Sequence, residues 1–246
     1  MVNEWLIEQL SLESPLFWLA LSALTLPLVY VLARRAPPRA AAWIAVMRWV
    51  LIPYMGLMLG GLSPRFLGLS KINWATTLSL GMVVLFAALA AGTAIRIALL
   101  AEARIGETSV PSPGAEAQQP WRWSGVLVTV FWIGAEQFHW CFVRGAIWET
   151  LLINPEIDAG LPAYRAMWLA TLVILPEIWL QPGGLAHHLL KAAILVVSAV
   201  AFFYTRNFWL CWVLSAGLWL LIAGPTSSVI QGMQLVRPEF APTTET

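Results

Sequence analysis

The hydrophobic residues of this chain gather in long apolar runs that are separated by short polar joints. A helix that crosses the hydrocarbon core of a membrane needs about 20 mostly apolar residues. Runs of this kind predict seven spanning helices, at approximately 15–33, 42–62, 75–100, 125–152, 163–181, 186–204 and 208–224. Only "PGG" separates the fifth run from the sixth, and only "TRN" separates the sixth from the seventh, which makes these helices antiparallel neighbours. The predicted fold is all-α: a polytopic transmembrane helix bundle of about seven spans.

The composition supports a membrane environment. The chain has 246 residues, of which 59% are hydrophobic and 11% charged, whereas soluble domains have roughly 45–50% apolar and about 25% charged residues. A soluble core of this size cannot bury the excess, so lipid must be part of the solvent. The net charge of +1 provides no basic field for nucleic acid. The expected partners are lipid and other membrane proteins, which pack side-on through helix–helix contacts.

Changes in composition divide the chain into five segments. Residues 102–123 are rich in Pro, Ser, Gly, Ala and Gln, which is typical of a flexible linker. The predicted organisation is an N-terminal interfacial segment at 1–14, a three-helix front at 15–101, a flexible linker at 102–124, a four-helix core at 125–224 and a C-terminal tail at 225–246.

The basic residues of the joints favour one orientation. Cytoplasmic loops of membrane proteins carry an excess of Lys and Arg. The joints on one side of the predicted bundle contain Arg34, Arg35, Arg39, Arg104 and Arg122, and the tail on the same side contains Arg237. The joints on the other side contain Arg65, Lys71, Arg165 and Arg206. The second side also has the acidic stretch "NPEIDAG". This bias predicts an N-terminus outside and a C-terminus in the cytoplasm.

Ionisable residues interrupt the fourth apolar run, in the stretch "GAEQFHWCFVRGAIWE" at 134–149. A charged side chain at the centre of a bilayer costs about 2.5–3.5 kcal/mol on insertion scales. Glu136, His139 and Arg144 are spaced to lie roughly on one side of a helix, so we expect them to point into the bundle. By the same spacing, Cys141 and Glu149 are expected to point elsewhere, with Glu149 solvated near the outer interface.

Several interpretations of these residues are open. Glu136 and His139 form half of a carboxylate–histidine metal motif of the kind found in helix bundles, but no second half is present, and we predict no metal site. His139 is also a candidate ligand of a cofactor such as a tetrapyrrole, or an interior histidine bonded to a neighbouring helix. Arg144 is expected to bond carbonyl groups, or Glu177 of the fifth run, across helices.

Two stretches of the back half resemble a known family. "CFVRGAIW" at 141–148 contains Arg144 and Gly145, and the joint "YTRNFW" at 204–209 precedes the last apolar run. Both are similar to motifs of the CAAX-prenyl-protease and bacteriocin-processing family of glutamate-dependent intramembrane proteases. The first family motif has two adjacent glutamates, three further residues and then Arg, usually Arg-Gly. The resemblance covers about 125–221 and implies a four-helix core like that of these proteases.

The chain departs from the family at the catalytic positions. With Arg144 as the motif arginine, the glutamate pair falls on His139 and Trp140. The histidine and asparagine of the last motif fall on Ser215 and Trp219. The resemblance therefore implies a degenerate member, in which a rebuilt catalytic site would have to use candidates from this set: Glu136, His139, Arg144 and Glu177.

These observations favour a non-catalytic membrane protein, used as a scaffold or as an accessory subunit of a membrane complex. The alternative is an intramembrane endopeptidase with a rearranged Glu/His site, since such chemistry needs a buried general base beside a water. A third possibility is a small transporter, or a protein that binds a lipid, a pigment or another hydrophobic ligand. No cofactor is required by the sequence, and His139 is the one candidate ligand for it.

Overall fold

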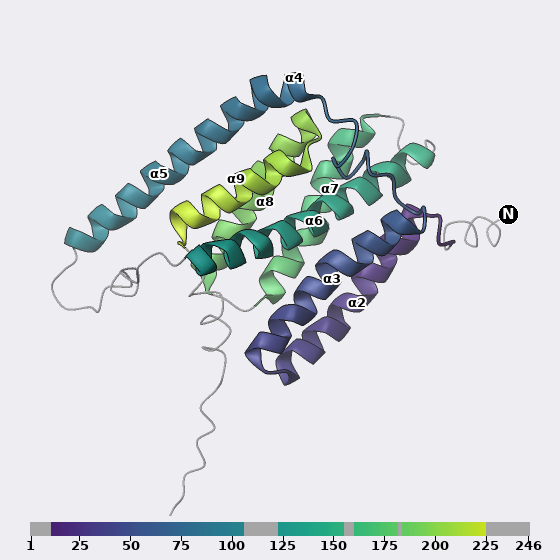
Figure 1. Cartoon of the computed structure of the whole chain (residues 1–246), viewed down its shortest axis with the longest axis horizontal. Helices are drawn as coiled ribbons and strands as arrows, with labels where there is room; N and C mark the ends of the chain where they lie inside the picture. The colour runs from purple at the N-terminus through teal and green to yellow at the C-terminus, as the bar shows by residue number, and fades with distance from the viewer. Residues whose placement is uncertain (1–10, 106–122, 155–159, 182–183, 225–246) are drawn as a thin grey trace, which may run out of the picture.

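The computed structural model describes residues 11–105, 123–154, 160–181 and 184–224. Over these residues every regular element is a helix and no strand is present (Figure 1). The elements are α2 (Pro15–Arg35), α3 (Pro38–Met58), α4 (Trp74–Thr76), η1 (Thr77–Gly81), α5 (Met82–Ile105), α6 (Trp123–Ile153), α7 (Pro162–Leu180), α8 (Leu185–Thr205) and α9 (Phe208–Ile222). Most of the predicted interfacial segment, most of the linker and the whole of the tail lie outside the described residues.

Each predicted apolar run corresponds to one long helix or, for the third run, to the consecutive elements α4, η1 and α5. Five helices of the described residues are long and apolar enough to cross a membrane. The apolar part of α3, Trp43–Met58, and the whole of α9 are shorter. A helix of the length of α9 rises only about 22 Å, which is less than the roughly 30 Å hydrocarbon core of a bilayer. The prediction of an all-helical membrane bundle is confirmed, whereas the number of complete spans is five by this measure.

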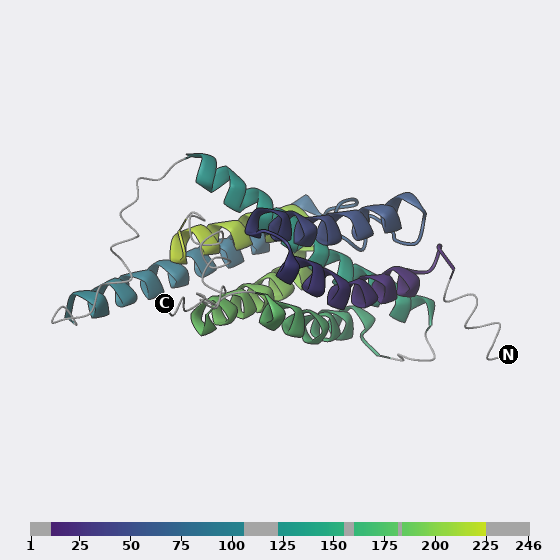
Figure 2. The ribbon, with the colours of Figure 1, turned by 90° about the horizontal axis from the view of Figure 1, so that it is seen from below.

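Helix α6 is the centre of the bundle. It packs against α2 and α3 on one side, against α7 on another, and against α9. From Gly134 to Trp148 all its residues except Phe138 are buried. Helix α5 packs along α9, so the helices of the predicted front lie on two sides of α6 and α9 (Figures 1 and 2). The stretch singled out in the sequence therefore occupies the middle of the molecule.

The outer helices present large apolar side chains on the surface. Leu24 of α2, Phe86 of α5 and Leu172 of α7 are each more than half exposed, at 74%, 62% and 66%. Many large apolar side chains exposed on several helices are normal where lipid or another protein covers them. The arrangement is that of a helical membrane protein, and the predicted sidedness of its termini stays a prediction.

The loop between α3 and α4 inserts into the bundle. Leu67 is fully buried, and the Gly68 carbonyl accepts a hydrogen bond from the Phe208 N–H at 3.1 Å. A Cβ atom on Gly145 would lie 2.9 Å from the Phe66 carbonyl oxygen, so the glycine after Arg144 is needed for this close approach. The Arg-Gly pair of the sequence thus has a packing role at the point where the loop meets α6.

The joint between α8 and α9 is a tight turn built from Arg206 and Asn207. Arg206 caps α8 in the left-handed conformation, with φ 47° and ψ 43°, a region that costs a residue with a Cβ about 1–2 kcal/mol. The Asn207 side chain then accepts hydrogen bonds from the backbone N–H groups of Trp209 and Leu210, which is the usual chemistry of a helix N-cap. This capping explains why the short joint "TRN" is sufficient to reverse the chain.

Candidate functional site

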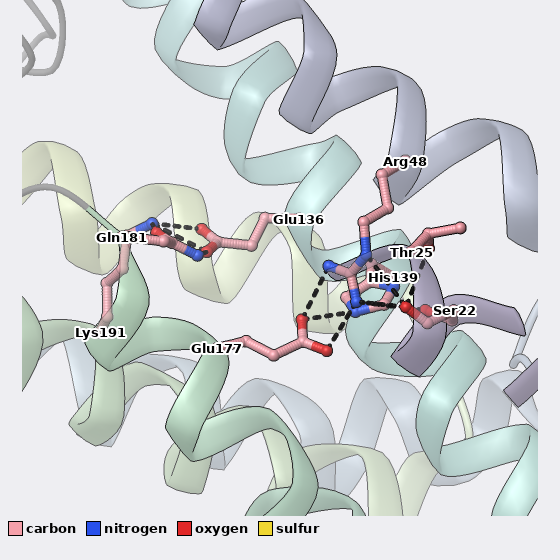
Figure 3. Close-up of polar contacts among 8 residues, drawn as sticks. All are labelled: Ser22, Thr25, Arg48, Glu136, His139, Glu177, Gln181 and Lys191. Atoms are coloured by element: carbon pink, nitrogen blue, oxygen red, sulfur yellow. Dashed lines mark hydrogen bonds and ion pairs between the residues drawn. The ribbon is translucent and has the colours of Figure 1, made fainter. Parts of the chain in front are cut away.

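The four candidate residues are all buried, but they do not form one cluster. Glu136, His139 and Arg144 lie on α6, and Glu177 lies on α7. None is more than 8% exposed. Glu177 and His139 share one hydrogen-bonded network, Glu136 belongs to a second network, and Arg144 bonds to α8. Figure 3 shows the first two networks side by side.

The first network, which we call the Arg48 network, consists of Ser22, Arg48, His139 and Glu177. The Arg48 guanidinium of α3 donates to both carboxylate oxygens of Glu177, at 3.0 Å from Nη1 and 2.7 Å from Nη2. His139 Nε2 lies 2.9 Å from Glu177 Oε2. An ionised carboxylate only accepts hydrogen bonds, so we place a hydrogen on His139 Nε2. One carboxylate thus joins three helices.

Arg48 also reaches a fourth helix. Its Nε and Nη2 donate to the Ser22 carbonyl of α2, at 3.3 and 3.0 Å, and Nη2 lies 3.3 Å from the Ser22 hydroxyl. The guanidinium is therefore paired with a charge on one side and satisfied by polar atoms on the other. A buried ion pair needs such additional hydrogen bonds to offset the desolvation of its charges.

The second network, which we call the Lys191 network, consists of Glu136, Gln181 and Lys191. The Lys191 ammonium of α8 donates to both carboxylate oxygens of Glu136, at 2.8 and 2.9 Å, and to the Gln181 amide oxygen. The Gln181 amide nitrogen donates to Glu136 at 3.0 Å. The ammonium also lies 5.9 Å from the ring centre of Trp49 and 5.7 Å from that of Trp219. This cation is held by a carboxylate, an amide and two indole rings.

Arg144 differs because no carboxylate is among its hydrogen-bond partners. Its Nη2 donates to the Leu195 carbonyl at 3.1 Å and to the Ser198 hydroxyl at 2.9 Å, and its Cζ lies 5.9 Å from the Phe202 ring centre. Its Nε and Nη1 have no hydrogen-bond partner among the described residues. The predicted bond to a carbonyl is confirmed. The predicted alternative partner, Glu177, is bound to Arg48 instead.

Two further residues of α6, Cys141 and Glu149, lie outside both networks. Cys141 is fully buried, because α6 has neighbouring helices on several sides. Glu149, expected to be solvated, is half-buried, and its Oε2 accepts a hydrogen bond from the Ser63 N–H at 3.0 Å. The other cysteine, Cys211, is also a buried free thiol.

Sequence reasoning missed Arg48, Lys191 and Gln181 as site residues. Arg48 and Lys191 each lie inside an apolar run, which is itself the signal that could have found them, because ionisable residues within spans are rare and are paired inside the bundle. Gln181, at the end of α7, carries no such signal. Its role depends on the short joint that brings the start of α8 back beside it.

A small cavity of about 10 Å³ lies beside the Lys191 network, and a cavity of this volume is at the lower limit for holding one water. It is lined by Ile133, Glu136, Gln137, Trp140, Lys191, Ile194, Ser215 and Trp219. Ser215 donates to the Gln137 amide oxygen at 3.1 Å. The cavity wall thus contains one carboxylate, already bonded to Lys191.

His139, the candidate cofactor ligand, has one nitrogen engaged by Glu177. Its other ring nitrogen, Nδ1, is buried without a hydrogen-bond partner, and its ring stacks on Phe142 at 5.9 Å. Within the described ranges, no group of three or more His, Cys, Asp or Glu side chains is arranged to hold a metal ion. The chemistry that this geometry offers is a hydrogen-bonded Glu–His pair and two interhelical ion pairs. Comparison of the chain with protein-family models, with curated proteins and with solved structures finds no match in any of the three.

Proposed function

We propose that this protein is a non-catalytic membrane scaffold, or an accessory subunit of a membrane complex. The observation that carries the proposal is the pairing of both buried carboxylates. Glu177 binds Arg48 and His139, and Glu136 binds Lys191 and Gln181. A general base must be free to accept a proton from a water, whereas these carboxylates have cations from other helices as partners. Their role in this proposal is to hold α3, α6, α7 and α8 together.

The proposal includes a family relationship. We propose that the back four helices are a degenerate form of the CAAX-protease-like core, with His139 and Trp140 in place of the glutamate pair. Two observations support it: Asn207 caps α9 as a joint of this kind requires, and Gly145 allows the loop to approach α6. In this proposal the polar positions of a former active site now serve interhelical bonding.

We propose that the partners are membrane proteins that contact the outer helices, together with lipid. Two candidate spans have few buried residues, about 11% in each: Pro15–Ala33, which is nearly the whole of α2, and Trp74–Ile97, which includes most of α5. Helices associate in membranes through close packing and a few polar bonds. We also propose the orientation that the sequence predicts, with the N-terminus outside and the C-terminus in the cytoplasm.

Co-purification tests the scaffold proposal. We expect the protein, cross-linked in its native membrane and then solubilised in a mild detergent, to be recovered with a membrane protein in constant stoichiometry. The cross-links should map to the exposed faces of α2 or α5. Recovery as a lone monomer in every detergent, with and without cross-linking, would contradict the proposal. An unrelated multi-pass protein from the same membrane serves as the control for random collisions.

The second candidate function is an intramembrane endopeptidase with a rearranged site. The observation that favours it is the 2.9 Å contact between His139 Nε2 and Glu177, because a hydrogen-bonded carboxylate and imidazole are a recurrent catalytic pair. In that function one carboxylate has to be reachable by water and able to exchange its proton. The reactivity of Glu136 and Glu177 towards a carboxyl reagent therefore separates the two functions.

A further inference from the structure

At one end of the bundle, two arginine side chains each lie over an aromatic ring. Arg65 Cζ lies 5.9 Å from the ring centre of Phe66, and Arg206 Cζ lies 4.5 Å from that of Trp148. The Phe66 and Trp148 rings are in edge contact, with centres 5.2 Å apart. We call these four residues the arginine ladder. Cation–π contacts of this length hold a guanidinium in place while leaving its N–H groups available.

The backbone that carries the ladder is well anchored. The Phe208 N–H donates to the Gly68 carbonyl at 3.1 Å, which ties the loop after α3 to the α8–α9 joint. A Cβ atom on Gly68 would lie 2.9 Å from the Arg206 carbonyl oxygen. Leu67, which lies between Phe66 and Gly68 in the chain, is fully buried. The two arginines thus come from segments that are in direct backbone contact.

The two cations have no counter-charge in the part of the chain that the structure describes. Both side chains are exposed, and no hydrogen bond or ion pair of either side chain is found there. Partial burial and the neighbouring charge of Arg65 lower the pKa of Arg206 below its usual value. The carboxylate of Glu149, next to Trp148, is bound to the Ser63 N–H. Two like charges held near each other in this way attract an anion.

The surroundings place this site at the level of lipid headgroups. Arg206 directly follows Thr205, the last residue of a membrane-length helix. Tyr204 and Trp209, on either side of the joint, are 55% and 46% exposed, and exposed Tyr and Trp are enriched at membrane–water interfaces. Apolar side chains that could line an acyl chain are exposed further along the same helices, at Val200 and Val213.

We propose that Arg65 and Arg206 bind the phosphate of an anionic membrane lipid. Guanidinium groups donate two parallel hydrogen bonds to phosphate oxygens, and a phosphate would neutralise both cations at once. The left-handed conformation of Arg206, which a glycine would adopt without strain, indicates that the side chain has a use at this position. The proposal is independent of the scaffold function.

Lipid titration monitored by native mass spectrometry tests the proposal. The full-length protein in a neutral detergent is titrated with phosphatidylglycerol and, in parallel, with phosphatidylcholine of the same acyl chains. We expect at least about a fivefold preference for phosphatidylglycerol. The Arg206→Gly variant, which removes the charge and relieves the backbone, should lose this preference, and Arg206→Lys should retain part of it because it keeps the charge without the planar fork.

Lys71→Gly is the matched control. Lys71 is the other non-glycine residue of the described chain with a positive φ, at 52°, and it is not part of the ladder. Its substitution changes the charge and the backbone in the same way as Arg206→Gly, and we expect unchanged lipid preference. Equal losses in both variants, or no loss in Arg206→Gly, would overturn the proposal.

Two further measurements test whether something other than a lipid binds the two arginines. Inorganic phosphate at millimolar concentration should not displace phosphatidylglycerol, since the lipid also gains from its acyl chains. Displacement would assign the site to a soluble phosphate. The acidic residues Glu156 and Asp158 lie outside the described residues, and a Glu156→Gln/Asp158→Asn variant should bind as the wild type does. Tighter lipid binding by this variant would mean that those carboxylates occupy the arginines, and would overturn the proposal.

Discussion

Replacing Glu177 by leucine is expected to lower the free energy of unfolding by about 3–5 kcal/mol, the usual effect of removing one partner of a buried ion pair. Glu177 is the only carboxylate bonded to Arg48 among the described residues, and it accepts hydrogen bonds from both Arg48 and His139. Without it the guanidinium remains inside the bundle with only the polar atoms of Ser22. The measurement is thermal unfolding of the purified protein in detergent, followed by circular dichroism.

A double variant shows whether the loss of stability comes from the charge that remains buried without its partner. Arg48→Met alone should also destabilise the protein, because it leaves the Glu177 carboxylate with His139 as its one remaining partner. Arg48→Met/Glu177→Leu removes both charges and retains similar volume, which is often neutral for a buried pair. We expect the double variant to be more stable than either single variant. Destabilisations that simply add would show that the two residues do not act as a pair.

In the Lys191 network we expect an asymmetry between the two partners. Lys191→Met should cost about 3–5 kcal/mol, because Glu136 would keep only the Gln181 amide as a partner. Glu136→Leu should cost about 2 kcal/mol less, because Lys191 still contacts the Gln181 oxygen and two indole rings, each worth about 0.5–2 kcal/mol. Thermal unfolding of the two variants in the same detergent measures this difference.

The contribution of the rings can be separated from that of the charges. In a Trp219→Leu background the ammonium loses one of its two indole contacts, so the gap between Lys191→Met and Glu136→Leu should become smaller. If the two substitutions lowered the free energy of unfolding equally in the wild-type background, this would contradict the proposal that the rings stabilise the Lys191 ammonium when Glu136 is absent.

The helices could be predicted closely because their limits are local features. Pro15, Pro38 and Pro162 stand at the first position of their helices, where a missing N–H does no harm. Asn207 caps α9 with its own side chain. Runs of apolar residues between such signals give the length of each helix without knowledge of its neighbours. The third run is divided into short elements at its start, but its limits agree with the prediction to within a few residues.

The pairing of the buried charges could not be predicted in the same way. Residues three apart on a helix differ in direction by about 60°, and on α6 this angle separates two neighbouring helices. Glu136 therefore meets Lys191 of α8, and His139 meets Glu177 of α7. Arg48 is 129 positions before Glu177 in the chain. The spacing shows that these groups point inward, but the choice of partner depends on how the helices pack around α6.

Labelling with a lipid-soluble carbodiimide, mapped by mass spectrometry, tests the central claim most directly. Such reagents attack protonated carboxyl groups that they can reach. Our account predicts no adduct on Glu136 or Glu177 of the wild-type protein, since both carboxylates are bound to cations of other helices. In folded Arg48→Met, Glu177 loses its cation in an apolar interior, takes up a proton and should be labelled. Rapid labelling of either glutamate in the wild type would contradict the account, because it would reveal an accessible, proton-exchanging carboxyl group of the kind that a protease needs.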